Sequence, residues 1–201
     1  MYRRGIVTQR QPRGPQFPRL NLGAAARLAA AVVAGSIIAG ILSAHWLLLS
    51  PGAVLHGALW QPLTYAFIIT GSIELLFDAI ILVTIGGELE RWWGPQRLTR
   101  FLVGVPVVAA LATCLLALAF PVLRDLYFAG GTAMATAAWC AYGWSLGTRY
   151  TNFWGITVTG DQLALIGIGM VVMRAAFASM LFVLPDLITV ALTYAFVRGR
   201  R

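Results

Sequence analysis

Four ionisable side chains lie inside apolar stretches that are long enough to span a bilayer: Glu74, Asp78, Arg174 and Asp186. A charge at the centre of a bilayer costs about 2.5–3.5 kcal/mol on insertion scales, so such residues face a bundle interior or a water-filled cavity. Glu74 and Asp78 are four residues apart and would share one face of a helix. We therefore expect this buried charge cluster to form the functional site of the chain.

Arg174 is the one base of the cluster, and we expect it to pair with one of the three carboxylates. Asp186 is the nearest of them in sequence. A rise of about 1.5 Å per residue from the predicted helix ends brings Glu74, Arg174 and Asp186 to one layer near the outer surface. Breaking a buried pair from one side costs about 3–5 kcal/mol, because the other charge is left uncompensated. The alternative is that Arg174 extends alone to the lipid headgroups.

The composition around these residues is typical of a polytopic membrane protein. The chain has 201 residues, of which 59% are hydrophobic, and its mean hydropathy is +0.79. These values exceed those of soluble domains. Six apolar segments reach the roughly 20 residues that a transmembrane helix needs, over residues 27–49, 66–86, 100–120, 130–148, 159–177 and 181–197. We therefore predict an all-α membrane domain of six transmembrane helices over residues 24–201.

The basic residues predict the orientation of the chain. All fifteen are arginines, and outside the spans nearly all fall in segments that lie on one side of the membrane. The positive-inside rule then places both termini in the cytoplasm, and we expect a bacterial inner membrane. Nucleic-acid binding is excluded as a function, because the chain has no folded basic surface.

The first 23 residues form a basic cytoplasmic arm rich in proline and glycine. Such a segment has no core of its own, so a partner protein would be needed to order it. Its arginines are candidates for contact with a partner or with anionic lipid headgroups. They are Arg3, Arg4, Arg10, Arg13 and Arg19.

Two further features concern packing. Residues 51–65 carry no charge and are interrupted by proline and glycine, which predicts an irregular element in the outer leaflet, packed against the bundle. Ala133, Ala137 and Ala141 recur every fourth residue, a spacing that lets a neighbouring helix approach closely. The alternative is an alanine-rich helix with no particular partner. The cysteines and histidines form no metal-binding pattern, and we expect neither a metal nor a cofactor.

Taken in order, five segments resemble the rhomboid intramembrane serine proteases, over residues 57–67, 71–78, 87–97, 130–142 and 186–194. The resemblance covers about residues 55–198 and implies a rhomboid-like six-helix bundle with an irregular outer loop after its first helix. In that family a serine on the fourth span is activated by a histidine on the sixth. A histidine and an asparagine on the second span help to bind the oxyanion.

The matching positions of this chain hold other residues, namely Thr132, Asp186, Glu74 and Asp78. A carboxylate is a poorer base than an imidazole near neutral pH. Losing one oxyanion donor costs roughly 2.7–4 kcal/mol of transition-state stabilisation, and an ionised carboxyl would also repel the developing charge. The resemblance therefore implies a pseudoprotease with no catalytic residues.

The function that we expect is thus non-catalytic. The chain would be an accessory subunit or a scaffold in a larger membrane complex, with transmembrane helices, other integral membrane subunits and lipids as its partners. Two alternatives remain open at this point. One is a residual intramembrane protease that uses Thr132 with Asp186 or a water. The other is a proton or ion path through Glu74, Asp78 and Asp186, because chains of carboxyls mark such routes.

Overall fold

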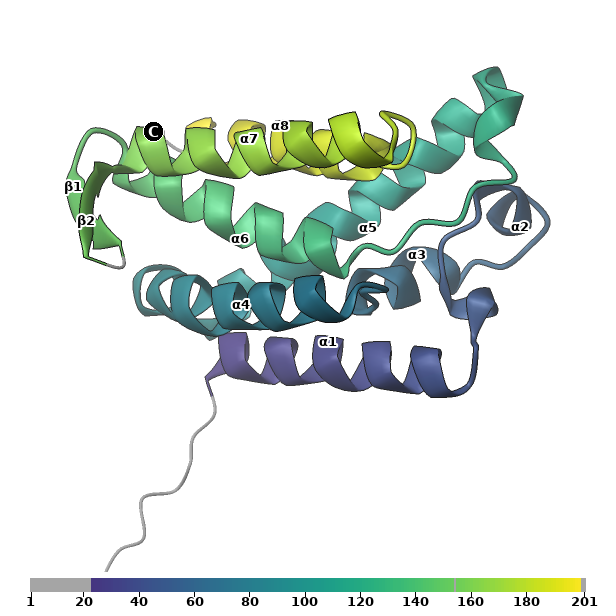
Figure 1. The fold of residues 1–201 in the computed structure, drawn as a ribbon, viewed down its shortest axis with the longest axis horizontal. Coiled ribbons are helices and arrows are strands. Elements are labelled where there is room, and N and C mark those ends of the chain that lie inside the picture. Colours follow the sequence, from purple (N-terminus) through teal and green to yellow (C-terminus); the bar gives the residue numbers. More distant parts are fainter. Residues whose placement is uncertain (1–22, 154, 200–201) are drawn as a thin grey trace, which may run out of the picture.

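The computed structural model describes residues 23–153 and 155–199, and these form a helical membrane domain (Figure 1). The predicted arm and its five arginines lie outside the described residues, apart from Gly23. The long helices are α1 (Ala24–Ile41), α4 (Ser72–Trp93), α5 (Pro95–Ala119), α6 (Gly131–Leu146), α7 (Gly160–Ala178) and α8 (Leu184–Arg198).

Fewer helices than predicted have the length and hydropathy of a membrane span. In the described part of the chain, α1, α5 and α7 meet both requirements. A fourth candidate is a broken span, in which α3 (Gln61–Thr64) and the 3-10 turn η2 (Tyr65–Phe67) meet α4 at 88°. Helices α6 and α8 have 16 and 15 residues. They cover less than the hydrocarbon thickness of about 30 Å, which explains the difference from the predicted six spans.

Helix α6 lies at the centre of the molecule. It packs against α4, α7 and α8, while α1 packs on the far side of α4 and α5 packs against α8. Figure 1 shows α1, α4, α6 and α7 stacked in this order. The three alanines predicted to pack, Ala133, Ala137 and Ala141, are completely buried. Small side chains at these positions let the neighbouring helices approach the axis of α6.

Glycines make the crossing of α6 and α7 closer still. A Cβ on Gly143 would lie 2.6 Å from the backbone nitrogen of Ala164 and 2.7 Å from the carbonyl oxygen of Gly160. A Cβ on Gly167 would lie 2.7 Å from the indole ring of Trp139. At each of these places a side chain would collide with its neighbour, so the helices cross only because glycine is present.

The connector between α1 and α4 is irregular, but its polar groups are satisfied. It contains α2 (Pro51–Leu55), α3, η2 and the 3-10 turn η1 (His45–Leu47). The buried side chain of Gln61 accepts a hydrogen bond from the Ser50 nitrogen and donates one to the Trp46 oxygen. The hydroxyl of Tyr65 donates to the Pro106 oxygen on α5, at 2.9 Å. These bonds satisfy non-helical backbone within a membrane protein.

Local signals explain where several helices begin. The carboxylate of Glu90 accepts hydrogen bonds from the first two nitrogens of α1, those of Ala24 and Ala25, at 2.9 Å each. A capping box formed by Thr159 and Gln162 starts α7. Pro95 starts α5 in the first turn, where no amide hydrogen is needed.

A β-hairpin departs from the all-α prediction. Strands β1 (Tyr150–Phe153) and β2 (Ile156–Thr159) are antiparallel, with Tyr150 opposite Thr159. Gly155 in the turn has a φ of 86°, which glycine adopts without strain. The β-branched residues of β2 favour an extended chain, but the segment is too short to have been distinguished from a loop by its periodicity.

The crossing of α6 and α7 yields a first prediction. Gly143→Ala should destabilise the protein by about 1–3 kcal/mol, because the methyl group would overlap the α7 backbone. Thermal unfolding in detergent, followed by circular dichroism, should show a Tm lowered by roughly 2–10 °C. Gly169→Ala is the matched control on α7, since a Cβ there meets nothing within 4 Å. Equal Tm values for the two variants would contradict the close crossing.

Candidate functional site

A groove of about 450 Å³ opens between α4 and α7, with α6 as its floor. Ile73, Phe77 and Met173 line its outer part and are more than half exposed. The lining also includes polar side chains from three helices. These are Glu74 and Asp78 from α4, Thr132 and Thr136 from α6, and Arg174 from α7. The groove is therefore mainly apolar, with a few polar side chains in its walls.

The charge cluster predicted from the sequence is assembled at this groove. Arg174 Nη1 donates to Asp186 Oδ2 on α8 at 2.9 Å, so the predicted pairing is present. Arg174 Nε lies 3.8 Å from Glu74 Oε1 on α4. The Asp186 side chain is 5% exposed, against 33% for Arg174 and 46% for Glu74. One guanidinium thus links carboxylates of two other helices, and Arg174 does not extend alone to the headgroups.

The positions of the two paired carboxylates follow from helix geometry. Glu74 lies in the first turn of α4, and Asp186 lies in the first turn of α8. The amino end of a helix carries a positive partial charge that stabilises a nearby carboxylate. Both acids are therefore favoured where they lie, even before Arg174 approaches. The short connection between α7 and α8 brings Arg174 beside Asp186.

Asp78, which the sequence placed on the same helix face as Glu74, is the most weakly partnered member of the cluster. Its side chain lies one helical turn below Glu74 and is 8% exposed. Its Oδ2 has no hydrogen-bond partner among the described residues. A buried oxygen without a donor costs free energy, and lipid chains cannot supply a donor. Asp78 lines the groove, and Thr132 hydrogen-bonds to the same carboxyl, so its unsatisfied Oδ2 lies beside the space that an occupant would fill.

The glycines before Thr132 have a packing role. The Gly130 nitrogen donates to the Tyr65 oxygen at 2.9 Å, and the Gly131 nitrogen donates to the Ile68 oxygen at 3.0 Å. A Cβ on Gly130 would lie 2.6 Å from an atom of the Tyr65 ring. These glycines therefore let η2 pack on the start of α6. Thr132 follows them as a buried residue in the wall of the groove.

Several residues that shape the site were not recognised in the sequence. Gly160 and Gly167 lie seven residues apart, so they share a face of α7, and this spacing was a usable signal for the crossing with α6. Trp139 lines the groove and donates from Nε1 to the Leu163 oxygen at 2.7 Å. No sequence pattern indicates this bond, because its acceptor belongs to another helix.

Comparison with known proteins gives a family for the helical domain. Residues 26–197 match the model of a family described as "Eukaryotic integral membrane protein (DUF1751)". No curated protein matches the chain. The match covers most of the sequence, including every residue of the charge cluster.

This match corrects two predictions made from the sequence. The assignment to the rhomboid proteases is wrong, because the matching family is a different one. The bacterial inner membrane is also wrong, because the family is described as eukaryotic. The resemblance depended on short segments rich in glycine, alanine and aromatic residues. Such residues recur wherever membrane helices pack closely, as Gly130 and Gly131 do here.

The ion pair yields a second prediction. Arg174→Met should destabilise the protein by up to about 3–5 kcal/mol, because Asp186 would be left buried and uncompensated. Adding Asp186→Leu to this variant should recover most of the loss, since both charges are then removed. Unfolding in detergent with increasing denaturant measures the difference.

The matched control for this prediction is Arg91→Met. Arg91 pairs with Glu88 at the surface, where its side chain is 73% exposed. Removing a surface pair should change stability by less than about 1 kcal/mol. If Arg174→Met were as mild as Arg91→Met, the ion pair would not hold α7 to α8.

Proposed function

The chain belongs to the DUF1751 family of eukaryotic integral membrane proteins, and we propose that it binds a transmembrane helix of another membrane protein in the groove between α4 and α7. Its role would be that of a non-catalytic scaffold or accessory subunit of a membrane complex. The observation that carries this proposal is the unpartnered Oδ2 of Asp78, buried in the wall of a groove whose mouth is apolar.

The shape and lining of the groove suit a helix. Ile73, Phe77 and Met173 are exposed at the mouth, so in a bilayer they face either lipid chains or another helix. The floor includes Ala135 from α6, whose small size permits a close approach between backbones. Flexible methionine side chains adapt to helices of different sequence.

The charges of the groove select the chemistry of the partner. Glu74, Asp78 and Arg174 line the groove, and Arg174 also pairs with Asp186, which is not part of the lining. Because Arg174 pairs with Asp186 and approaches Glu74, Asp78 is the carboxyl of the groove whose Oδ2 has no donor among the described residues. We therefore propose a partner helix that carries a basic or hydrogen-bond-donating side chain at the depth of Asp78.

Six membrane crossings are part of the proposal. Among the described residues, six arginines lie near the starts of α1 and α5 or near the ends of α4, α6 and α8, and Arg124 follows the opposite end of α5. The six are Arg27, Arg91, Arg97, Arg100, Arg149 and Arg198. The starts of α1 and α7 and the ends of α6 and α8 lie at the same side of the molecule (Figure 1). If every long helix crosses the membrane, these six arginines face one compartment and Arg124 faces the other, a bias that agrees with the positive-inside rule.

A synthetic helix tests the binding. A poly-leucine transmembrane peptide with one central lysine, labelled for energy transfer, should associate with the labelled protein in liposomes. The all-leucine peptide should associate about 3- to 30-fold more weakly, which corresponds to one hydrogen bond in a membrane. Asp78→Leu should remove the preference for lysine.

Glu88→Gln is the matched control, because Glu88 lies outside the groove on the same helix. It should leave the preference for lysine unchanged. Equal association of the two peptides with the parent protein would contradict the proposal. So would a preference for lysine that survives Asp78→Leu.

A non-catalytic groove predicts no hydrolysis. The purified protein should not cleave a model transmembrane substrate, and a serine-hydrolase probe should not label it. Asp186 already accepts a hydrogen bond from Arg174, which competes with any role as a base for Thr132. Cleavage that disappears in Thr132→Ala would contradict the proposal and favour an intramembrane protease.

A further inference from the structure

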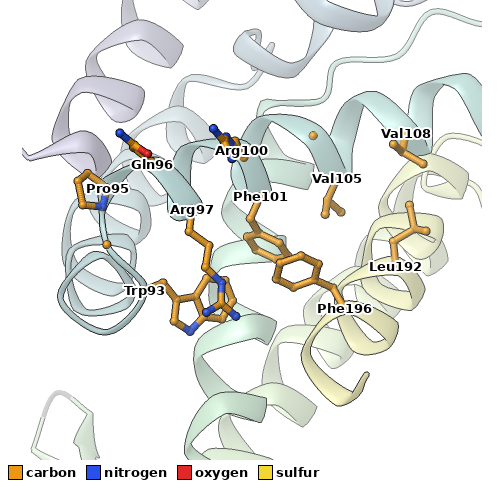
Figure 2. A pocket seen from close by; sticks show the side chains of 12 residues that line it. Trp93, Pro95, Gln96, Arg97, Arg100, Phe101, Val105, Val108, Leu192 and Phe196 are labelled. Carbon is orange, nitrogen blue, oxygen red and sulfur yellow. The ribbon is translucent and has the colours of Figure 1, made fainter. Parts of the chain in front are cut away.

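A second groove opens between the first half of α5 and the last half of α8, and we propose that it binds an anionic phospholipid. Its volume is about 890 Å³. Arginines and Trp93 lie at one end, and aliphatic and phenylalanine side chains line the rest (Figure 2). This groove shares no lining residue with the groove between α4 and α7, so the inference is independent of the proposed function.

The apolar part of the groove suits an acyl chain. It is lined by Phe101, Val105, Val108, Leu192 and Phe196. From Arg97 to Val108 helix α5 rises about 16 Å, which is close to half the hydrocarbon thickness of a bilayer. Its lining thus extends over the depth of one leaflet.

Gly104 keeps the middle of this groove open. It lines the groove, and a Cβ built at this position would meet nothing within 4 Å. A side chain here would therefore begin in open space. This makes Gly104 the position at which to place a bulky residue in the groove.

The polar end of the groove carries positive charge. Arg97 and Arg100 are three residues apart on α5, both are exposed, and both line the groove. The guanidinium of Arg97 lies 5.0 Å from the centre of the Trp93 ring and 6.0 Å from that of Phe196. Stacking on these rings positions the group at the mouth of the apolar channel, as Figure 2 shows. Guanidinium groups bind phosphate oxygens in a bidentate manner.

The carboxylates at this end of α4 have other partners. Glu90 accepts hydrogen bonds from the first nitrogens of α1, and Glu88 pairs with Arg91 at 2.8 Å. The stretch from Glu88 to Arg100 holds three arginines and two glutamates, so its net charge is positive, and the first turn of α5 adds the positive end of its dipole. The acidic headgroup of a lipid complements this charge, while the acyl chain of the same lipid contacts the apolar lining.

Among possible occupants, an anionic phospholipid matches both halves of the groove. A soluble anion would use the arginines alone and leave the apolar channel unfilled. A zwitterionic lipid would fill the channel but gain less from Arg97 and Arg100. Basic residues beside a membrane surface favour anionic over neutral lipids for this reason.

Native mass spectrometry of the full chain tests the proposal. The protein is mixed in detergent with phosphatidylserine or with phosphatidylcholine that has the same acyl chains. The detergent is then removed in the mass spectrometer, and the bound lipids are counted from the mass of the protein. Phosphatidylserine should be retained up to about 30-fold more strongly, as expected for two arginines near the headgroup at about 1 kcal/mol each. Arg97→Gln with Arg100→Gln should abolish this preference. Gly104→Trp should reduce the retention of both lipids, because the indole fills the channel.

Arg149→Gln is the matched control, since Arg149 lies before the hairpin and outside the groove. It should retain the full preference for phosphatidylserine. Equal retention of the two lipids by the parent protein would overturn the proposal, as would an unchanged preference in the double variant or unchanged retention in Gly104→Trp. If inorganic phosphate displaced phosphatidylserine at matched concentration, the groove would be an anion site and not a lipid site.

Discussion

The contact of Arg174 with Asp186 and Glu74 is the interaction on which the geometry of the site depends. It joins α7 to α8 and approaches α4, and it neutralises charges that a bilayer could not otherwise accommodate. With these two carboxylates occupied, Asp78 is left with an oxygen that has no donor among the described residues. The polar character of the groove between α4 and α7 therefore depends on how Arg174 divides its contacts between Asp186 and Glu74.

Helix α6 makes this arrangement possible. Its alanines and Gly143 allow α4, α7 and α8 to pack closely around it, so three charged side chains from different helices can meet near its start. The two grooves that result differ in charge. The groove between α4 and α7 has an excess of carboxyls, whereas the groove between α5 and α8 has arginines at its mouth. The groove between α4 and α7 suits a transmembrane helix that carries a hydrogen-bond donor. The groove between α5 and α8 suits an anionic lipid.

The sequence predicted what depends on local geometry. It indicated the apolar segments, the shared face of Glu74 and Asp78, and the pairing of Arg174 with Asp186, because helical spacing and the cost of a buried charge are properties of the chain itself. It did not predict that Asp78 Oδ2 has no donor among the described residues, nor that Gly143 meets Gly160, since both depend on which helices become neighbours. The mistaken family arose for a related reason, because close helix packing selects similar small residues in different families of membrane proteins.

Site-specific photocrosslinking in native membranes tests the central claim most directly. A photoreactive phenylalanine at Phe77, in the mouth of the groove, should crosslink to another membrane protein, and Asp78→Leu should abolish the adduct. The same probe at Leu115, which is exposed on α5, should give only lipid adducts. If Phe77 and Leu115 gave the same products, or if the protein adduct at Phe77 did not depend on Asp78, the groove would not be a helix-binding site.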